Sequence, residues 1–259
     1  MKFDIESMEP ILRLIVKAVE KGVGEDIREY LASTDKATNN AVPLMRADNI
    51  NTNLRDGVAS DDVVELKYFK RSAWTGCLLI DRENQVTYTI CTEQTLDGIP
   101  KKPNRRIPHY LQTILYIQNG DIEPRYKQQS LFEMFPDIIQ FSDEDYQEDY
   151  KSIMGDELSF GDEYRHLVVV YETEYLAITS IALKMLDKDF HTAQEYSLES
   201  LLRPDFSELT AVTEKDSKEE KKDSHSLVSV KAGLKRTRES EPQKETKISA
   251  KKVEEKKQA

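Results

Sequence analysis

The spacing of apolar residues changes near residue 62, and this change constrains the fold more than any other feature of the sequence. Before it, apolar side chains recur at intervals of three and four residues from Met8 to Val19, which predicts an amphipathic helix. Ser7 is suited to cap the start of this helix, and Gly22 is suited to end it.

A second, shorter helix is predicted by Ile27, Tyr30 and Leu31. The stretch that follows, residues 37–57, contains five asparagines and no strong period. Asparagine favours turns because its side chain bonds the local backbone. We therefore expect residues 37–57 to form a long irregular connection.

Strand patterns follow residue 62. Residues 62–71 predict one strand, and residues 74–94 predict a hairpin in which two apolar runs flank the polar turn "DRENQ". Residues 107–120 predict a helix that packs on the sheet, and residues 166–186 predict two further strands in the sheet interior. Residues 197–202 predict a short closing helix. This order indicates an α+β fold: a single domain with a central, mainly antiparallel sheet and N-terminal helices.

The composition divides the chain near residue 212. From Thr213 onward, 14 lysines and arginines oppose 10 acids, whereas the preceding body has 23 against 38, so the net charges are +4 and −15. The segment 213–259 has no aromatic residue and few aliphatic ones, too few to offset the entropy of ordering it. We expect residues 1–212 to be globular and residues 213–259 to be a disordered tail. The tail's cationic cluster, which could contact phosphates, is Lys231, Lys235, Arg236 and Arg238.

The sequence indicates a cytoplasmic protein that does not span a membrane. No window of about 20 apolar residues is present, and Arg13 and Lys17 interrupt the first apolar stretch. Cys77 and Cys91 are too few for a disulfide scaffold. If Arg82 pairs with Val86 across the hairpin turn, the two cysteines lie opposite one another and could form a disulfide on oxidation.

A basic loop, "KKPNRRIPH", contains Lys101, Lys102, Arg105 and Arg106 just before the helix of residues 107–120. The partial positive charge at a helix N-terminus makes this position unfavourable for cations unless an anion lies near. The anion could be internal, from the nine acids of residues 142–163, or external, from the phosphates of a nucleic acid. The body's negative charge favours the internal pairing. Residues 142–163 themselves predict an exposed loop or a weak helix.

A polar stretch at residues 39–56 offers a second candidate binding site at Arg46, Asp48, Asn51 and Arg55. Guanidinium and amide groups recognise hydrogen-bonding edges well. The alternative is that these side chains satisfy the stretch's own backbone.

The element order helix, three strands, helix, strand resembles the core of the PD-(D/E)xK nucleases, among other folds. That family places an Asp on the second strand and a Glu-x-Lys on the third, where two carboxylates hold Mg²⁺. Here Asp81 ends the second strand, but Glu93 is followed by Gln94 and Thr95, so the lysine is missing. The one Glu-x-Lys of this region begins at Glu65 on the preceding strand. We expect Glu65, Asp81 and Glu93 to be edge and turn charges, with a degenerate nuclease site as the alternative.

Motifs of other catalytic classes are missing from the sequence. It contains no nucleophile elbow, HExxH motif or EF-hand loop, and its nine glycines form no phosphate-binding loop. His109 and His166 occupy positions where imidazole is commonly packed or hydrogen-bonded. The sequence therefore favours a protein without catalytic activity, cofactor or metal.

Three stretches, "RADNINTNLRD", "WTGCLLID" and "IPHYLQTILYIQN", resemble an uncharacterised bacterial protein family of unknown function. The resemblance covers about residues 1–200 and implies an intracellular bacterial protein. Together with the charge pattern, it favours a binding or regulatory protein whose partner is another protein or a nucleic acid. An acidic module that presents residues 142–163 to a basic partner is a further alternative.

Overall fold

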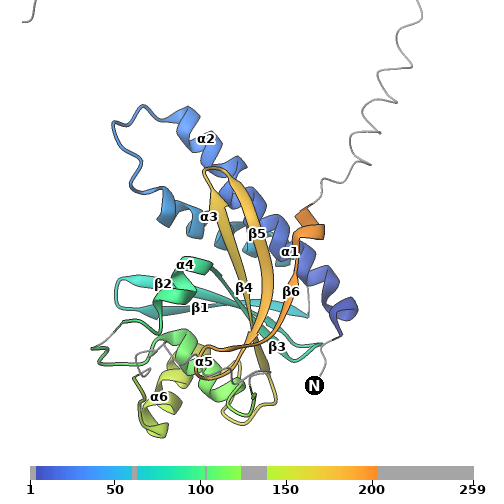
Figure 1. Ribbon diagram of the computed structural model, residues 1–259, viewed down its shortest axis with the longest axis vertical. Helices are drawn as coiled ribbons and strands as arrows, with labels where there is room; N and C mark the ends of the chain where they lie inside the picture. The colour runs from blue at the N-terminus through green and yellow to red at the C-terminus, as the bar shows by residue number, and fades with distance from the viewer. Residues whose placement is uncertain (1–3, 60–62, 103, 124–138, 203–259) are drawn as a thin grey trace, which may run out of the picture. The chain divides into compact units, whose positions relative to one another are not determined.

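The computed structural model of the chain describes residues 4–59, 63–102, 104–123 and 139–202. These residues belong to one compact unit, Met1–Pro204. The segment 213–259 lies outside the described residues. Figure 1 shows helices packed on a strongly twisted sheet. The α+β class predicted from the sequence is confirmed.

Three helices form the N-terminal part: α1 (Ile5–Val23), α2 (Glu25–Ser33) and α3 (Val42–Val58). The first two are predicted correctly, although Asp4 rather than Ser7 caps the start of α1, and the helix passes through Gly22 to end at Val23 with Gly24 as its C-cap. The third corrects the expected irregular connection. Ile50, Leu54 and Val58 repeat every four residues and are buried against α1, so packing stabilises a helix that local composition does not favour. Gly22 permits this packing, since a Cβ there would lie 2.8 Å from the Ile50 side chain.

The sheet contains six strands in sequential order (Figure 1). All neighbouring strands are antiparallel except β3 and β4, which are parallel. Their bounds are β1 Val64–Arg71, β2 Trp74–Asp81, β3 Val86–Thr92, β4 Arg165–Glu174, β5 Ala177–Leu186 and β6 Thr192–Ser197. The sequence does not predict β6, in which only Ala193 is buried.

Four further elements complete the fold: α4 (Glu93–Gly98), α5 (Tyr110–Gln118), α6 (Asp143–Met154) and the 3₁₀ helix η1 (Glu199–Leu202). Helix α6 replaces the loop or weak helix expected within residues 142–163. Ser142 and Asp145 form a capping box at its start, and Tyr146, Tyr150 and Ile153 bury its inner face.

Alternate strand residues build cores on the two faces of the sheet. Leu79 and Tyr88 face α1 and α3, whereas Leu78, Ile80 and Val168 face α5 and its neighbours. The sheet is thus a middle layer with helices on both sides.

The register between β2 and β3 differs by one residue from the register in which Arg82 would pair with Val86. Asp81 pairs with Val86, so Cys77 and Cys91 point to opposite faces of the sheet. Cys77 donates to Asn51 of α3, and Cys91 packs beside α4 and α5. Both thiols are free.

Candidate functional site

Polar side chains of residues 39–56 form hydrogen bonds and ion pairs with other residues of the chain. Arg46 donates to Thr173 and to the Tyr175 carbonyl, which ties α3 to the turn between β4 and β5. Asn51 accepts from Cys77, and Arg55 pairs with its neighbour Asp56. Asp48 is exposed and accepts from Thr52 only through its carbonyl oxygen. Among the described residues, no hydrogen bond or ion pair joins any two of these four candidates.

The three candidate nuclease residues also lie apart. Glu65 pairs with Arg82 at 2.7 Å, and Glu93 pairs with Lys184 at 2.7 Å. Asp81 is buried and accepts from the backbone and side-chain nitrogens of Asn84. The element order that suggested the nuclease core is present, as α3, β1, β2, β3, α5 and β4. Within the described ranges, however, no cluster of three histidine, cysteine or carboxylate side chains could hold a metal ion.

The acids of residues 142–163 pair with cations other than those of the basic loop. Asp149 pairs with Arg71, and Glu157 pairs with Arg82 and Lys67. In the part of the chain that the structure describes, no ion pair involves Lys101, Lys102, Arg105 or Arg106. The expected internal pairing of the basic loop is therefore not found there.

Part of the basic loop lines a hollow of about 260 Å³, which we call the basic–aromatic groove. One wall is the turn between β1 and β2, and the other is the loop that leads into α5; both lie on one side of the molecule in Figure 1. The groove is defined by Arg71, Trp74, Arg105, Arg106, Ile107, Pro108, His109 and Tyr110. Three of these residues are arginines and none is a carboxylate.

Each wall of the groove is tied to the other. Arg71 donates to the Pro108 carbonyl at 3.3 Å while its guanidinium also pairs with Asp149. Partial burial lowers the pKa of Arg105, so this cation has lost part of its hydration, and no ion pair among the described residues compensates for that loss. Such a cation gains more from an incoming anion than one that is fully hydrated.

His109 caps α5 as a neutral imidazole. Its Nδ1 atom accepts from the Leu111 amide at 3.2 Å. Burial, with smaller contributions from Arg105, Arg71 and Lys102, lowers the pKa of His109 to about 3. The histidine therefore adds no charge to the groove at neutral pH.

Aromatic rings form the apolar part of the groove. Trp74 stacks on Tyr110 with ring centroids 5.4 Å apart, and Phe69 contacts both rings. The sequence predicts the cations of the loop but not the contribution of Trp74 and Arg71, because these lie about 30 residues earlier on another element. The only available signal is a lone tryptophan beside a strand turn.

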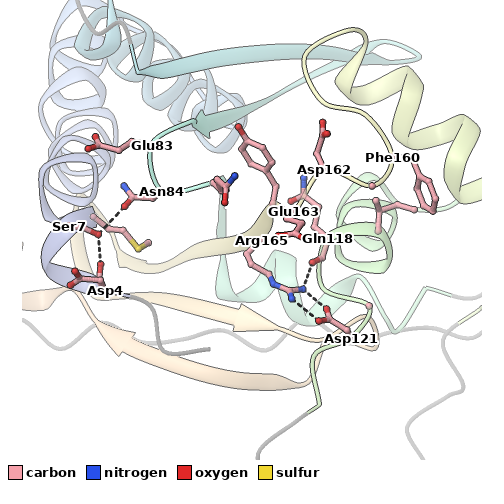
Figure 2. A pocket seen from close by; sticks show the side chains of 16 residues that line it. Asp4, Ser7, Glu83, Asn84, Gln118, Asp121, Phe160, Asp162, Glu163 and Arg165 are labelled. Atoms are coloured by element: carbon pink, nitrogen blue, oxygen red, sulfur yellow. Dashed lines mark hydrogen bonds and ion pairs between the residues drawn. The ribbon is translucent and has the colours of Figure 1, made fainter.

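A second, larger hollow of about 820 Å³ has the opposite charge, and we call it the acidic pocket (Figure 2). Five carboxylates line it: Asp4, Glu83, Asp121, Asp162 and Glu163. Arg165 is the only cation in its lining, and it donates to Asp121 at 2.6 Å and to the Gln118 carbonyl at 2.7 Å. This pairing lowers the pKa of Asp121 and leaves four carboxylates in excess.

A family model described as a family of unknown function (DUF5986) matches residues 5–251. This match confirms the resemblance to an uncharacterised family. No curated protein and no solved structure matches the chain. Among the described residues, no helix has the length and apolar character needed to cross a membrane.

Proposed function

We propose that this chain, which belongs to the family of unknown function DUF5986, is a non-enzymatic binding protein whose ligand carries phosphate groups and occupies the basic–aromatic groove. We also propose, from the sequence, that the protein is bacterial and cytoplasmic. The residues that we propose to bind this ligand are Lys101, Lys102, Arg105 and Arg106.

One observation carries the proposal: three arginines and no carboxylate line the groove, and only Arg71 of the three forms an ion pair with another described residue. Arginine presents a planar fork of donors that matches phosphate oxygens. Lys101 and Lys102 are exposed in the same loop and add positive charge near the groove. A phosphate ligand would supply the anion that no described residue provides to Arg105 and Arg106, whereas Arg71 already pairs with Asp149.

The negative charge of the body does not remove this possibility. At physiological ionic strength, charges are screened beyond about 8 Å. A phosphate at the groove therefore interacts chiefly with the loop cations, while the net charge weakens its approach from a distance.

The test is polyanion binding by the parent chain and by a variant with Lys101, Lys102, Arg105 and Arg106 changed to Ala. We expect the slope of log K against log salt to fall by about 3 to 4 units with little change in melting temperature. A matched control replaces the same number of exposed cations on α1 and α2: Arg13, Lys17, Lys21 and Arg28. An equal loss of slope in the control, or no binding by the parent at low salt, would refute the proposal.

A second candidate function follows from the acidic pocket. Four carboxylates that form no ion pair with any described residue surround a hollow large enough for a side chain or a short peptide segment. This arrangement favours a partner that inserts a lysine or arginine, as expected for an acidic interaction module.

The measurement for this second candidate is binding of an arginine-rich peptide to the parent and to a Glu83→Gln, Asp162→Asn, Glu163→Gln variant. Weaker binding by the variant alone would support it. A control that neutralises the exposed acids Glu144, Glu148 and Asp156 keeps the same change in net charge.

A further inference from the structure

Trp74 is one of the large apolar side chains that remain exposed on the described surface. It begins β2 at the rim of the groove, and 46% of its surface is accessible. Tyr110 backs the indole as a stacked ring, with 30° between the ring planes. Phe69 meets the indole edge-on at 5.8 Å. These contacts fix the ring's orientation while leaving apolar surface exposed.

Gly76 of β2 leaves room for the rings of Phe69 and Trp74. A Cβ on Gly76 would lie 2.4 Å from Phe69 Cζ and 2.7 Å from Trp74 Cη2. Both rings therefore occupy space that any other residue at this position would need. The exposed indole is thus a rigid feature of the groove.

A rigid, exposed aromatic ring beside cations is typical of sites that bind single-stranded nucleic acid. Bases stack on aromatic side chains, and the neighbouring cations follow the phosphate backbone. Arg105 and Arg106 supply this charge on the wall opposite Trp74.

We propose that the ligand of the basic–aromatic groove is single-stranded nucleic acid, with an unpaired base stacked on Trp74 and adjacent phosphates bound by Arg105 and Arg106. This inference rests on the proposed function and names its ligand. A base in a duplex is already stacked on its neighbours and does not offer a free face. The groove's volume of about 260 Å³ is below the usual 300–1,000 Å³ of small-molecule pockets, which suits one part of a polymer.

The first experiment uses the fact that Trp74 is the chain's only tryptophan. Intrinsic fluorescence of the full chain is followed during titration with an oligothymidylate of about 16 nucleotides at low salt. The controls are an abasic oligomer of the same length, a duplex of the same length and inorganic polyphosphate. We expect quenching by the oligothymidylate, with tighter binding than any control.

The second experiment compares variants by a method that does not depend on tryptophan, such as anisotropy of a labelled oligomer. Trp74→Ala should weaken oligothymidylate binding about 5- to 100-fold and leave abasic binding unchanged. Trp74→Phe should restore most of the loss. Tyr175→Ala, at an aromatic residue that is 77% exposed and lies outside the groove, is the matched control.

The outcomes separate this inference from the proposed function. Equal binding of oligothymidylate and abasic oligomer, with both weakened by Arg105→Ala and Arg106→Ala, would refute base stacking and keep phosphate binding. Tighter binding of the duplex would also refute the inference. No binding of any polyanion would refute both proposals. If Trp74→Ala does not fold, the comparison of oligomers on the parent chain still decides.

Discussion

Asp81 is a carboxylate whose surroundings separate a structural role from a catalytic one. It is 2% exposed and accepts from Asn84 N at 3.0 Å and Asn84 Nδ2 at 2.8 Å. These bonds close the turn between β2 and β3. The sequence places the residue correctly at this turn, but it cannot show that Glu65 and Glu93 bind different cations.

We predict that Asp81→Ala lowers the free energy of unfolding by about 1 to 3 kcal/mol, because both Asn84 donors lose their acceptor. Urea denaturation measures this effect. Asp97→Ala, at an exposed carboxylate of α4, should change stability by less than about 0.5 kcal/mol. A fully stable Asp81→Ala protein that loses a Mg²⁺-dependent nuclease activity would instead support the degenerate-nuclease alternative.

His166 links stability to pH. Its ring lies in the core, where Nδ1 is 2.7 Å from Thr87 Oγ1 and Nε2 is 2.9 Å from Thr89 Oγ1. Burial lowers the pKa of His166 to about 3. Below pH 6.5, the unfolded chain therefore takes up a proton that the folded chain does not.

We predict that this histidine's contribution to stability is fully present above about pH 6.5 and is lost as the pH falls toward 3. The loss is about 1.4 kcal/mol per pH unit. In His166→Gln, the decrease in unfolding free energy between pH 6.5 and 5.5 should be smaller than in the parent by about 1 kcal/mol, because the unfolded imidazole is already half protonated at pH 6.5. The readout is the pH slope and not the absolute stability, which the variant also lowers. Parallel pH curves for parent and variant would contradict the prediction.

At the scale of elements, α3 shows what a single sequence can and cannot reveal. Its three buried apolar residues form one narrow stripe among asparagines and aspartates, so the local signal favours a turn-rich segment. The helix depends on α1, whose Gly22 admits Ile50 at close range. Strong periodic patterns, as in α1 and β4, predict their elements correctly because burial and local preference agree there.

We predict that Leu54→Ala in α3 lowers the free energy of unfolding by about 2 to 5 kcal/mol, since the side chain is 1% exposed within the core. Leu44→Ala in the same helix is the control, because Leu44 is 69% exposed. The control should change stability by less than about 0.5 kcal/mol. Two small effects would indicate that residues 42–58 do not pack as a helix.

The sequence predicts most of the strands but not their register or all of their neighbours. A shift of one residue between β2 and β3 sends Cys77 and Cys91 to opposite faces. Likewise, the parallel pairing of β3 and β4 depends on a long connection through α4, α5 and α6. Local patterns identify a strand, but the turn length and the packed helices determine its register and neighbours.

At the scale of the whole molecule, α5 connects two surfaces of opposite charge. Its first residue, Tyr110, lines the basic–aromatic groove, and its last, Gln118, lines the acidic pocket. The rise along this helix is only about 13 Å. A polyanion in the groove would be repelled if it extended along α5 toward the pocket, so the two surfaces together favour one direction for a bound strand.

The segment 213–259, which lies outside the described residues, permits a final prediction about the whole chain. A chain that ends at residue 212 should keep its melting temperature within about 2 °C, because the removed sequence has few apolar residues to bury. It should also bind polyanions more weakly than the full chain, since it loses a net charge of +4 and the cluster around Arg236. Circular dichroism melting and the salt slope measure the two effects.

If the groove is the main site, the truncated chain still loses affinity when Arg105 and Arg106 are changed to Ala. A large fall in melting temperature would show that the segment packs on the body, and a truncated chain without any polyanion binding would place the site in the segment instead.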